Sequence, residues 1–347
     1  MRRCYLDYNA TAPLRAEART AMIAAMDQVG NPSSVHAEGR AAKAIVEKAR
    51  GQIATAFGAD GADIVFTSGA TEAAALACAG RGLQGADVEH DAVAAWIQPD
   101  HLVRADGTVE ITEPESSVLQ MANSETGIVQ SLPKGLAVTD ATQAFGKLPV
   151  AFNWLGADMA LISAHKIGGP KGVGAVVLRR GRDLPAQIKG GGQEMGRRAG
   201  TENVVAIAGF GAAAERAAQD LADGVWQRVA EIRNILETAL ETRLKEIILI
   251  GRDVERLPNT SCLAILGWKG ETQVMQMDLS GFAVSAGSAC SSGKVKASRV
   301  LRAMGYEDDL AACAIRLSLG PTTTESDVLE FADVWLKKYD TFRARAA

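Results

Sequence analysis

The chain has 347 residues, of which 47% are hydrophobic and 22% are charged, which is long enough for a protein of two domains. Its formal net charge is −4, and the absence of blocks of like charge argues against nucleic acid or a membrane surface as a partner. The longest apolar run, residues 204–214, is too short to span a bilayer, and the N-terminus lacks the apolar region of a signal peptide. Five scattered cysteines without a CxxC pair argue against a disulfide framework and favour a cytoplasmic location.

Helices and strands are expected to alternate along most of the chain. Apolar residues at helical spacing predict helices at residues 15–28, 36–57, 70–79, much of 203–247, and 298–304. Short apolar runs predict strands at residues 63–67, 117–121, 136–139, 159–163, 174–178 and 262–266. This alternation predicts an α/β fold with a mostly parallel sheet that is covered on both faces.

The segment TSGATE, residues 67–72, lies between a predicted strand and a predicted helix. Unpaired N–H groups at a helix N-terminus, next to a glycine, form an anion site, and Thr71 would add a hydroxyl group. The alternative is an ordinary capped turn. The segment lacks the GxxxxGK[ST] pattern, which disfavours a nucleoside triphosphatase.

Two polar residues follow the ends of predicted parallel strands. Asp140 would point into the crevice where α/β proteins bind ligands and could hold a proton on a heterocyclic nitrogen, with a helix N-cap as the equal alternative. Lys166 lies in a glycine-flanked turn and is a candidate Schiff-base amine, with Lys171 as its rival. A phosphate-binding turn, a strand-end Asp and a strand-end Lys in this order together indicate pyridoxal phosphate.

Three further residues are distinguished by their surroundings. Cys290 lies in a small polar loop, where a thiolate could be exposed and move, although an incidental surface cysteine is the alternative. His90 could stack on a planar cofactor and shuttle protons, which makes it a candidate catalytic residue. Arg316 lies in an apolar strand and needs a partner, which could be a substrate carboxylate or a structural ion pair. The remaining thiols in apolar segments are expected to be buried, namely Cys78, Cys262 and Cys313.

Taken in order, these segments resemble the cysteine desulfurases of the NifS/IscS type, within the class V aminotransferase family of pyridoxal phosphate enzymes. The resemblance covers nearly the whole chain and is carried by YLDYNAT (5–11), GNPSS (30–34), TSGATE (67–72), ANSETG (122–127), DATQ (140–143), SAHK (163–166), residues 190–203, SACSS (288–292) and RLSLG (316–320). It implies a pyridoxal phosphate-dependent transferase of fold type I, with a mostly parallel seven-stranded sheet flanked by helices and a smaller α+β domain. Residues 12–235 would form the large cofactor domain, and residues 1–11 with 236–347 the small domain that carries the Cys290 loop.

The resemblance also implies residue roles. Lys166 would form the Schiff base, Asp140 would pair with the pyridine nitrogen, His90 would stack on the ring and Cys290 would take the sulfur. Cofactor contacts are implied for Ala70, Thr71, His90, Asn123, Asp140, Gln143, Ser163, His165, Lys166 and, across the interface of a homodimer, Thr201. Contacts with the substrate L-cysteine are implied for Asn9, Asn31, Asn123 and Arg316. No resident metal is implied, although Cys290 is a candidate for transient iron–sulfur ligation.

The implied reaction removes sulfur from L-cysteine and gives L-alanine and a Cys290 persulfide. An acceptor protein, such as an iron–sulfur scaffold, would then take the sulfur for cluster assembly or thiolation. The alternatives are a selenocysteine lyase, another lyase of the same fold, and a trimmed non-catalytic homologue that relays sulfur or acts as a scaffold. The intervals 72–89, 90–123 and 123–140 are shorter than is typical of the family, so we expect an active but shortened enzyme.

Overall fold

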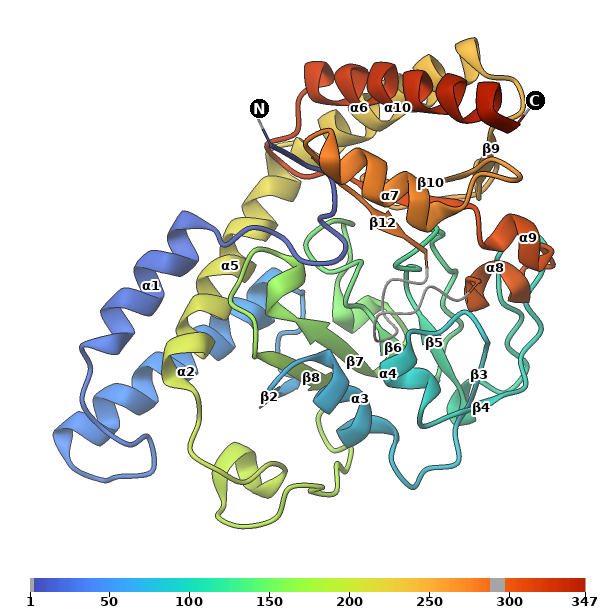
Figure 1. Cartoon of the computed structure of the whole chain (residues 1–347). Coiled ribbons are helices and arrows are strands. Elements are labelled where there is room, and N and C mark those ends of the chain that lie inside the picture. Colours follow the sequence, from blue (N-terminus) through green and yellow to red (C-terminus); the bar gives the residue numbers. More distant parts are fainter. Residues whose placement is uncertain (1–2, 288–296, 347) are drawn as a thin grey trace.

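The computed structural model describes residues 3–287 and 297–346, and its main feature is a five-stranded sheet (Figure 1). The strands lie in the order β2-β8-β7-β6-β5, with the bounds β2 (Asp63–Thr67), β5 (Val118–Gln120), β6 (Leu136–Asp140), β7 (Ala157–Ser163) and β8 (Gly174–Leu178). Strands β5, β6 and β7 pair in parallel, and β8 is antiparallel to both β7 and β2. Four of the five strands therefore run in one direction, as expected for a mostly parallel sheet.

The described residues give this sheet five strands and not the seven that were expected. The short intervals between the motifs account for the difference. Between α3 (Ala70–Cys78) and β5, the chain forms only the two-residue strands β3 (Gln84–Gly85) and β4 (Gln98–Pro99), which pair with each other in a separate sheet. This segment also contains the single-turn helix α4 (Asp91–Ala94).

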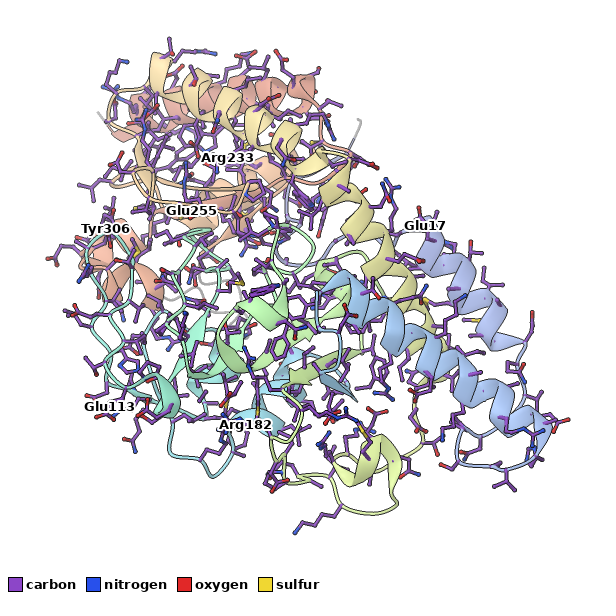
Figure 2. The ribbon with its side chains drawn as sticks, turned by 180° about the vertical axis from the view of Figure 1, so that it is seen from behind. Glu17, Glu113, Arg182, Arg233, Glu255 and Tyr306 are labelled. Carbon is purple, nitrogen blue, oxygen red and sulfur yellow. The ribbon has the colours of Figure 1, made fainter. Side chains whose placement is uncertain are left out.

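Side-chain alternation along the strands buries both faces of the sheet. Ile64 and Phe66 of β2 lie in a core with α1 (Ala16–Met26), α2 (Ala37–Ala56) and α5 (Val204–Ala222). Val65, between them in the sequence, points to the opposite face and packs in the core that contains α3. Figure 2, viewed from behind, shows α1, α2 and α5 lying together along one side of the molecule. Because both faces of the sheet are buried, its strands are apolar along most of their length and do not alternate with polar residues.

The helical segment predicted at 203–247 is divided into two helices, α5 and α6 (Val225–Arg243), at Gly224. Gly224 has φ +73°, a left-handed conformation that glycine adopts without steric cost. The buried side of α5 packs on the large sheet, whereas Trp226 and Leu236 of α6 pack in a separate core. The predicted domain boundary at residue 235 falls within α6, and the division into two domains remains a proposal.

The second core lies around an antiparallel sheet in the order β12-β13-β10-β9. Its strands are β9 (Ile248–Ile250), β10 (Thr260–Ala264), β12 (Ser285–Ala286) and β13 (Ala314–Ser318). Figure 1 shows α6 and α10 (Glu325–Ala346) side by side above it. The remaining helices of this part are α7 (Gly270–Leu279), α8 (Arg299–Ala303) and α9 (Asp308–Ala311), and four 3₁₀ turns lie elsewhere, at Pro114–Ser116, Phe152–Trp154, Ala164–Lys166 and Gln193–Gly196.

An N-terminal arm, residues 3–15, connects the two sheets. Its strand β1 (Cys4–Tyr5) pairs in parallel with β11 (Phe282–Ala283), and Asp7 forms a bridge to Ser318 of β13. The arm then passes over the edge of the large sheet, where the Ala12 N–H donates to the carbonyl of His165. In the described residues, no helix has the length and apolar character needed to cross a membrane.

Candidate active site

A cavity of about 550 Å³ lies at one edge of the large sheet. Because β8 runs against the other strands, its first residues lie at the same edge as the last residues of β2, β5, β6 and β7. Eight predicted site residues line this cavity, namely Ala70, Thr71, His90, Asp140, Gln143, Ser163, His165 and Lys166. The sheet thus brings together residues that are almost one hundred positions apart in the sequence.

The N-terminus of α3 forms the part of the cavity predicted to bind an anion. The first helical hydrogen bond runs from the Ala73 N–H to the carbonyl of Gly69, so the N–H groups of Ala70 and Thr71 precede the hydrogen-bonded helix. Glu72 reaches back to accept a hydrogen bond from the Ser68 N–H at 2.8 Å. Arg198 forms an ion pair with Glu72 at 2.8 Å, and this pairing offsets the negative charge of the Glu72 carboxylate.

Lys166 lies in the 3₁₀ turn after β7, where its amine reaches the N-terminal arm. Its Nζ donates to the carbonyls of Asn9 at 2.7 Å and Ala10 at 2.9 Å. The neighbouring His165 places Nδ1 3.2 Å from the hydroxyl of Thr11. Burial, followed by the charges of Lys166 and other lysines, lowers the pKa of His165 to about 4. The imidazole is therefore neutral at neutral pH, in a cavity with an excess of positive charge.

Asp140 and His90 have positions set by local backbone hydrogen bonds. Asp140 ends β6, and its Oδ1 accepts from the Thr142 N–H at 2.9 Å. His90 is the N-cap of α4, and its Nδ1 accepts from the Ala92 N–H at 3.1 Å. In the neutral ring this bond places the proton on Nε2. The carboxylate and the imidazole line the same cavity as Lys166.

Two buried carboxyl groups beside this site were not identified from the sequence. Burial, and secondarily the charge of Asp140, raise the pKa of Glu89 to about 8, and its Oε2 has no hydrogen-bond partner in the described residues. Burial likewise raises the pKa of Glu125 to about 7. Glu125 accepts from the Ser298 hydroxyl at 2.6 Å. Both lie in polar surroundings in the sequence, so no local pattern distinguishes them from exposed carboxylates.

Arg316 lies on β13 and is almost completely buried. Its guanidinium donates to Asp7 at 2.6 Å and to the carbonyl of Ser124 at 2.9 Å, while Nε is buried with no partner in the described residues. The structure thus contains the ion pair that was one of the two alternatives. Ser124 lines the main cavity, so Arg316 reaches its wall, and contact with a substrate carboxylate stays a prediction.

Among the described residues, the other predicted site residues do not line the main cavity. Asn123 is buried, and its Oδ1 accepts from the N–H groups of Glu125 and Thr126, both at 2.9 Å. Thr201 lines an adjacent cavity of about 180 Å³, whose wall shares Ser68 and Gly172 with the main one. Asn9 is buried and takes part in several hydrogen bonds. Asn31 is exposed, in the loop between α1 and α2. Cys290 lies outside the described residues.

The buried state predicted for three other cysteines is confirmed. Cys78, Cys262 and Cys313 are buried in the structure, and Cys4 is half-buried. Burial raises the pKa of Cys78 and of Cys262 to about 12, which keeps these thiols protonated and unreactive. Among the described residues, no group of His, Cys, Asp and Glu side chains is arranged to hold a metal ion.

Comparisons with known proteins show the family and the fold of the chain. The family model for aminotransferase class V matches residues 4–102 and 107–331. The chain is 37% identical to a protein named cysteine desulfurase IscS from Dictyoglomus turgidum, over 96% of this chain and 93% of that one. It is 38% identical to a cysteine desulfurase from Cereibacter sphaeroides, over 99% and 97% of the two chains. The solved structure of a NifS-like protein from Rickettsia africae superposes with a TM-score of 0.88, at 31% identity, and covers 97% of this chain and 99% of that one. The chain belongs to the class V aminotransferase family and has its NifS-like fold.

Proposed function

We propose that this chain is a cysteine desulfurase that acts on L-cysteine with pyridoxal phosphate as its cofactor. One observation carries the proposal: Lys166, Asp140 and the N-terminus of α3 line a single cavity. An amine, a carboxylate and an anion site are the three groups that an aldehyde, a ring nitrogen and a phosphate require. The relatives named as cysteine desulfurases support the assignment of the substrate.

The residues present fit this cofactor in charge as well as in kind. Lys166 and Lys171 line the cavity together with the neutral imidazole of His165. Asp140 is the carboxylate among the lining residues, so the described part of the cavity has an excess of positive charge that suits a phosphate dianion. Ala70, Thr71 and Ser163 would contact the phosphate, and Gln143 and Asn123 would contact the oxygen on the ring.

Bound pyridoxal phosphate would supply an electrophilic aldehyde and a ring that withdraws electrons from the substrate. Lys166, in its neutral form, is the nucleophile for the aldehyde and afterwards carries a proton from the α-carbon of the substrate. Asp140 would pair with the ring nitrogen and favour its protonated form, and His90 would stack on the ring. Arg316, with Asn9 and Asn31, would hold the carboxylate of L-cysteine.

Cys290 is the proposed sulfur acceptor. Its thiolate forms an S–S bond with the substrate sulfur while the C–S bond breaks, and the carbon takes up a proton in place of the sulfur and leaves as L-alanine. The persulfide would pass its sulfur to an acceptor protein, such as an iron–sulfur scaffold. We further propose a homodimer in which Thr201 reaches the phosphate of the neighbouring subunit, in the cytoplasm, where thiols stay reduced.

The test is to load the purified chain with pyridoxal phosphate, add L-cysteine and a reductant, and measure alanine and sulfide. We expect both products in equal amounts, with loss of both in Lys166→Ala and Cys290→Ser. Cys4→Ser is the matched control, because it removes a thiol outside the cavity lining and should keep full turnover. Selenocysteine is assayed in parallel as a substrate, and a preference for it over L-cysteine would support the selenocysteine lyase alternative.

Each outcome addresses a different part of the proposal. Unchanged turnover in Cys290→Ser would exclude the persulfide mechanism. A loaded wild type without a visible absorption band would exclude the cofactor. A loaded wild type that gives neither alanine nor sulfide would support the scaffold alternative.

A further inference from the structure

His90 is the N-cap of α4, a helix of four residues, which is too short to be stable without tertiary contacts. Its ring Nδ1 accepts from the Ala92 N–H at 3.1 Å, and its backbone carbonyl accepts from the Val93 N–H at 2.8 Å. The orientation of the imidazole in the main cavity therefore depends on the backbone of residues 89–92. The contacts that hold this backbone decide how the ring is oriented.

The large sheet and the loop after β5 hold the residues that precede His90. The carbonyl of Val88 accepts from Gln120 Nε2 at 2.7 Å and from Asn123 Nδ2 at 3.0 Å. The Glu89 carboxyl group accepts from the Gln120 N–H at 2.7 Å. These bonds reach the chain only before His90, whereas the residue directly after it is exposed.

Arg299 of α8 contacts both neighbours of His90, although it lies 210 positions from Glu89 in the sequence. Its Nη2 donates to the Glu89 carbonyl at 2.6 Å and to the Asp91 carboxylate at 3.1 Å, and its Nη1 lies 3.6 Å from Asp87 Oδ1. Figure 1 shows α8 beside the segment that contains α4. Among the described residues, Arg299 is the side chain that hydrogen-bonds on both sides of His90.

The start of α8 is itself fixed against the same part of the molecule. Ser298, the N-cap of α8, accepts from the Leu301 N–H at 3.2 Å and donates to Glu125 at 2.6 Å. Leu301 packs in one core with Val88. The backbone of Arg299 is therefore held close to the segment that its guanidinium binds.

The ion pairs of Arg299 do not explain this arrangement by their contribution to stability. The side chains of Asp87 and Asp91 are more than half exposed, and ion pairs between exposed groups are weak because water screens them. The bond to Glu89 is different, since Glu89 is buried and a buried carbonyl needs a donor. Both bonds come from one nitrogen of a planar guanidinium, so their directions are fixed relative to each other.

We propose that Arg299 is a positioning residue: by binding the Glu89 carbonyl and the Asp91 carboxylate, it fixes the orientation of the His90 imidazole in the main cavity. Without this contact, residues 89–92 are held from the side of the large sheet, and the ring no longer keeps its bond to the Ala92 N–H. The contribution of His90 to the reaction rests on the proposed function, but the orientation of its ring does not.

The test determines which ring nitrogen of His90 carries the proton, in the full chain without added cofactor. Histidine rings are labelled with nitrogen-15, and long-range proton–nitrogen spectra record the signals of both ring nitrogens. The chain has four histidines, so the signals lost in His90→Gln assign those of His90. A pH of about 7.5 keeps free imidazole largely neutral and lies below the pKa of the buried Glu89, which is about 8.

The test variant is Arg299→Met, which removes the donors and keeps a long side chain. Arg302→Met is the matched control, because Arg302 lies on the same helix and is paired with Asp308 at 2.6 Å. In the wild type we expect the proton on Nε2, as the bond from the Ala92 N–H requires.

Arg299→Met should shift both ring signals of His90 toward those of free histidine, in which both tautomers are populated, whereas Arg302→Met should leave them unchanged. If Arg299→Met leaves the signals of His90 in place, or if Arg302→Met shifts them as much, the proposal is wrong. Arg299→Gln replaces Arg299→Met if that variant does not fold, because the shorter amide cannot reach both groups, and the same direction is expected.

Turnover by the cofactor-loaded chain tests whether Arg299 acts through His90. Arg299→Met should lower the turnover of L-cysteine by about threefold or more in the wild-type background, and much less in the His90→Gln background. An equal loss in both backgrounds would show that Arg299 acts by another route and would overturn this role. A loaded wild type without turnover would count against the proposed function and leave the result on the His90 ring intact.

Discussion

The carboxyl group of Glu89 should make the stability of the protein depend on pH in an unusual direction. Glu89 is completely buried, its Oε1 accepts from the Gln120 N–H at 2.7 Å, and its pKa is raised from 4.5 to about 8, chiefly by burial. The native state therefore keeps the proton at pH values where the unfolded chain releases it. Each pH unit in this window is worth about 1.4 kcal/mol, so stability should fall as the pH rises from 5 to 8.

Glu89→Gln should remove this dependence, because an amide has the shape of the protonated acid and can still accept from Gln120. We expect the two proteins to have similar stability at pH 5 and the variant to be more stable by about 2–4 kcal/mol at pH 8. Denaturant unfolding at half-unit pH intervals and constant ionic strength measures the difference. Glu115→Gln, at an exposed position, is the control for the loss of one charge. Parallel pH profiles for wild type and Glu89→Gln would refute the argument.

Two further predictions concern the arm and the backbone. Asp7→Asn removes the charge paired with the buried Arg316 and should cost about 3 kcal/mol or more in denaturant unfolding, whereas an unchanged midpoint would mean that water replaces the pair. Gly320→Ala would place a methyl group 2.0 Å from the ring of Tyr8 and should lower the melting temperature or prevent folding. Gly51→Ala, in α2 with no neighbour within 4 Å, should instead raise stability by about 0.5–1 kcal/mol, and the opposite order of the two glycine variants would contradict the packing argument.

Local patterns predicted the regular elements well. The strands predicted at 63–67 and 174–178 match β2 and β8 to the residue, because turn residues bound continuous apolar runs there. The strand predicted at 262–266 lies two residues earlier, as β10 (Thr260–Ala264), since its polar first residues are buried by contacts with β13 that no local pattern contains. The five-stranded count and the reversed direction of β8 likewise depend on pairing over long distances.

Site residues could be predicted where they follow the end of an apolar strand in the sequence. Residues whose properties depend on burial in the folded chain could not be predicted. Asp140 and Lys166 could be located because each follows an apolar run. Lys147 and Glu89 look like surface residues in the sequence, and only the folded chain shows that water is excluded from them. The pairing of Arg316 with Asp7 joins residues 309 positions apart, a distance at which one sequence gives no signal.

The N-terminal arm has a consequence for how the protein is made. The arm supplies the Asn9 and Ala10 carbonyls that hold Lys166, and it pairs with Phe282 and Ala283 of β11 and bridges to Ser318. A ribosome releases this segment before it synthesises these partners, which lie nearly 300 residues later in the sequence. The large sheet can therefore form before the arm pairs with β11 and β13, and the arm gains these strand partners only when translation is almost complete. The position of the Asn9 and Ala10 carbonyls against Lys166 is thus supported by strand pairing with residues at the other end of the chain.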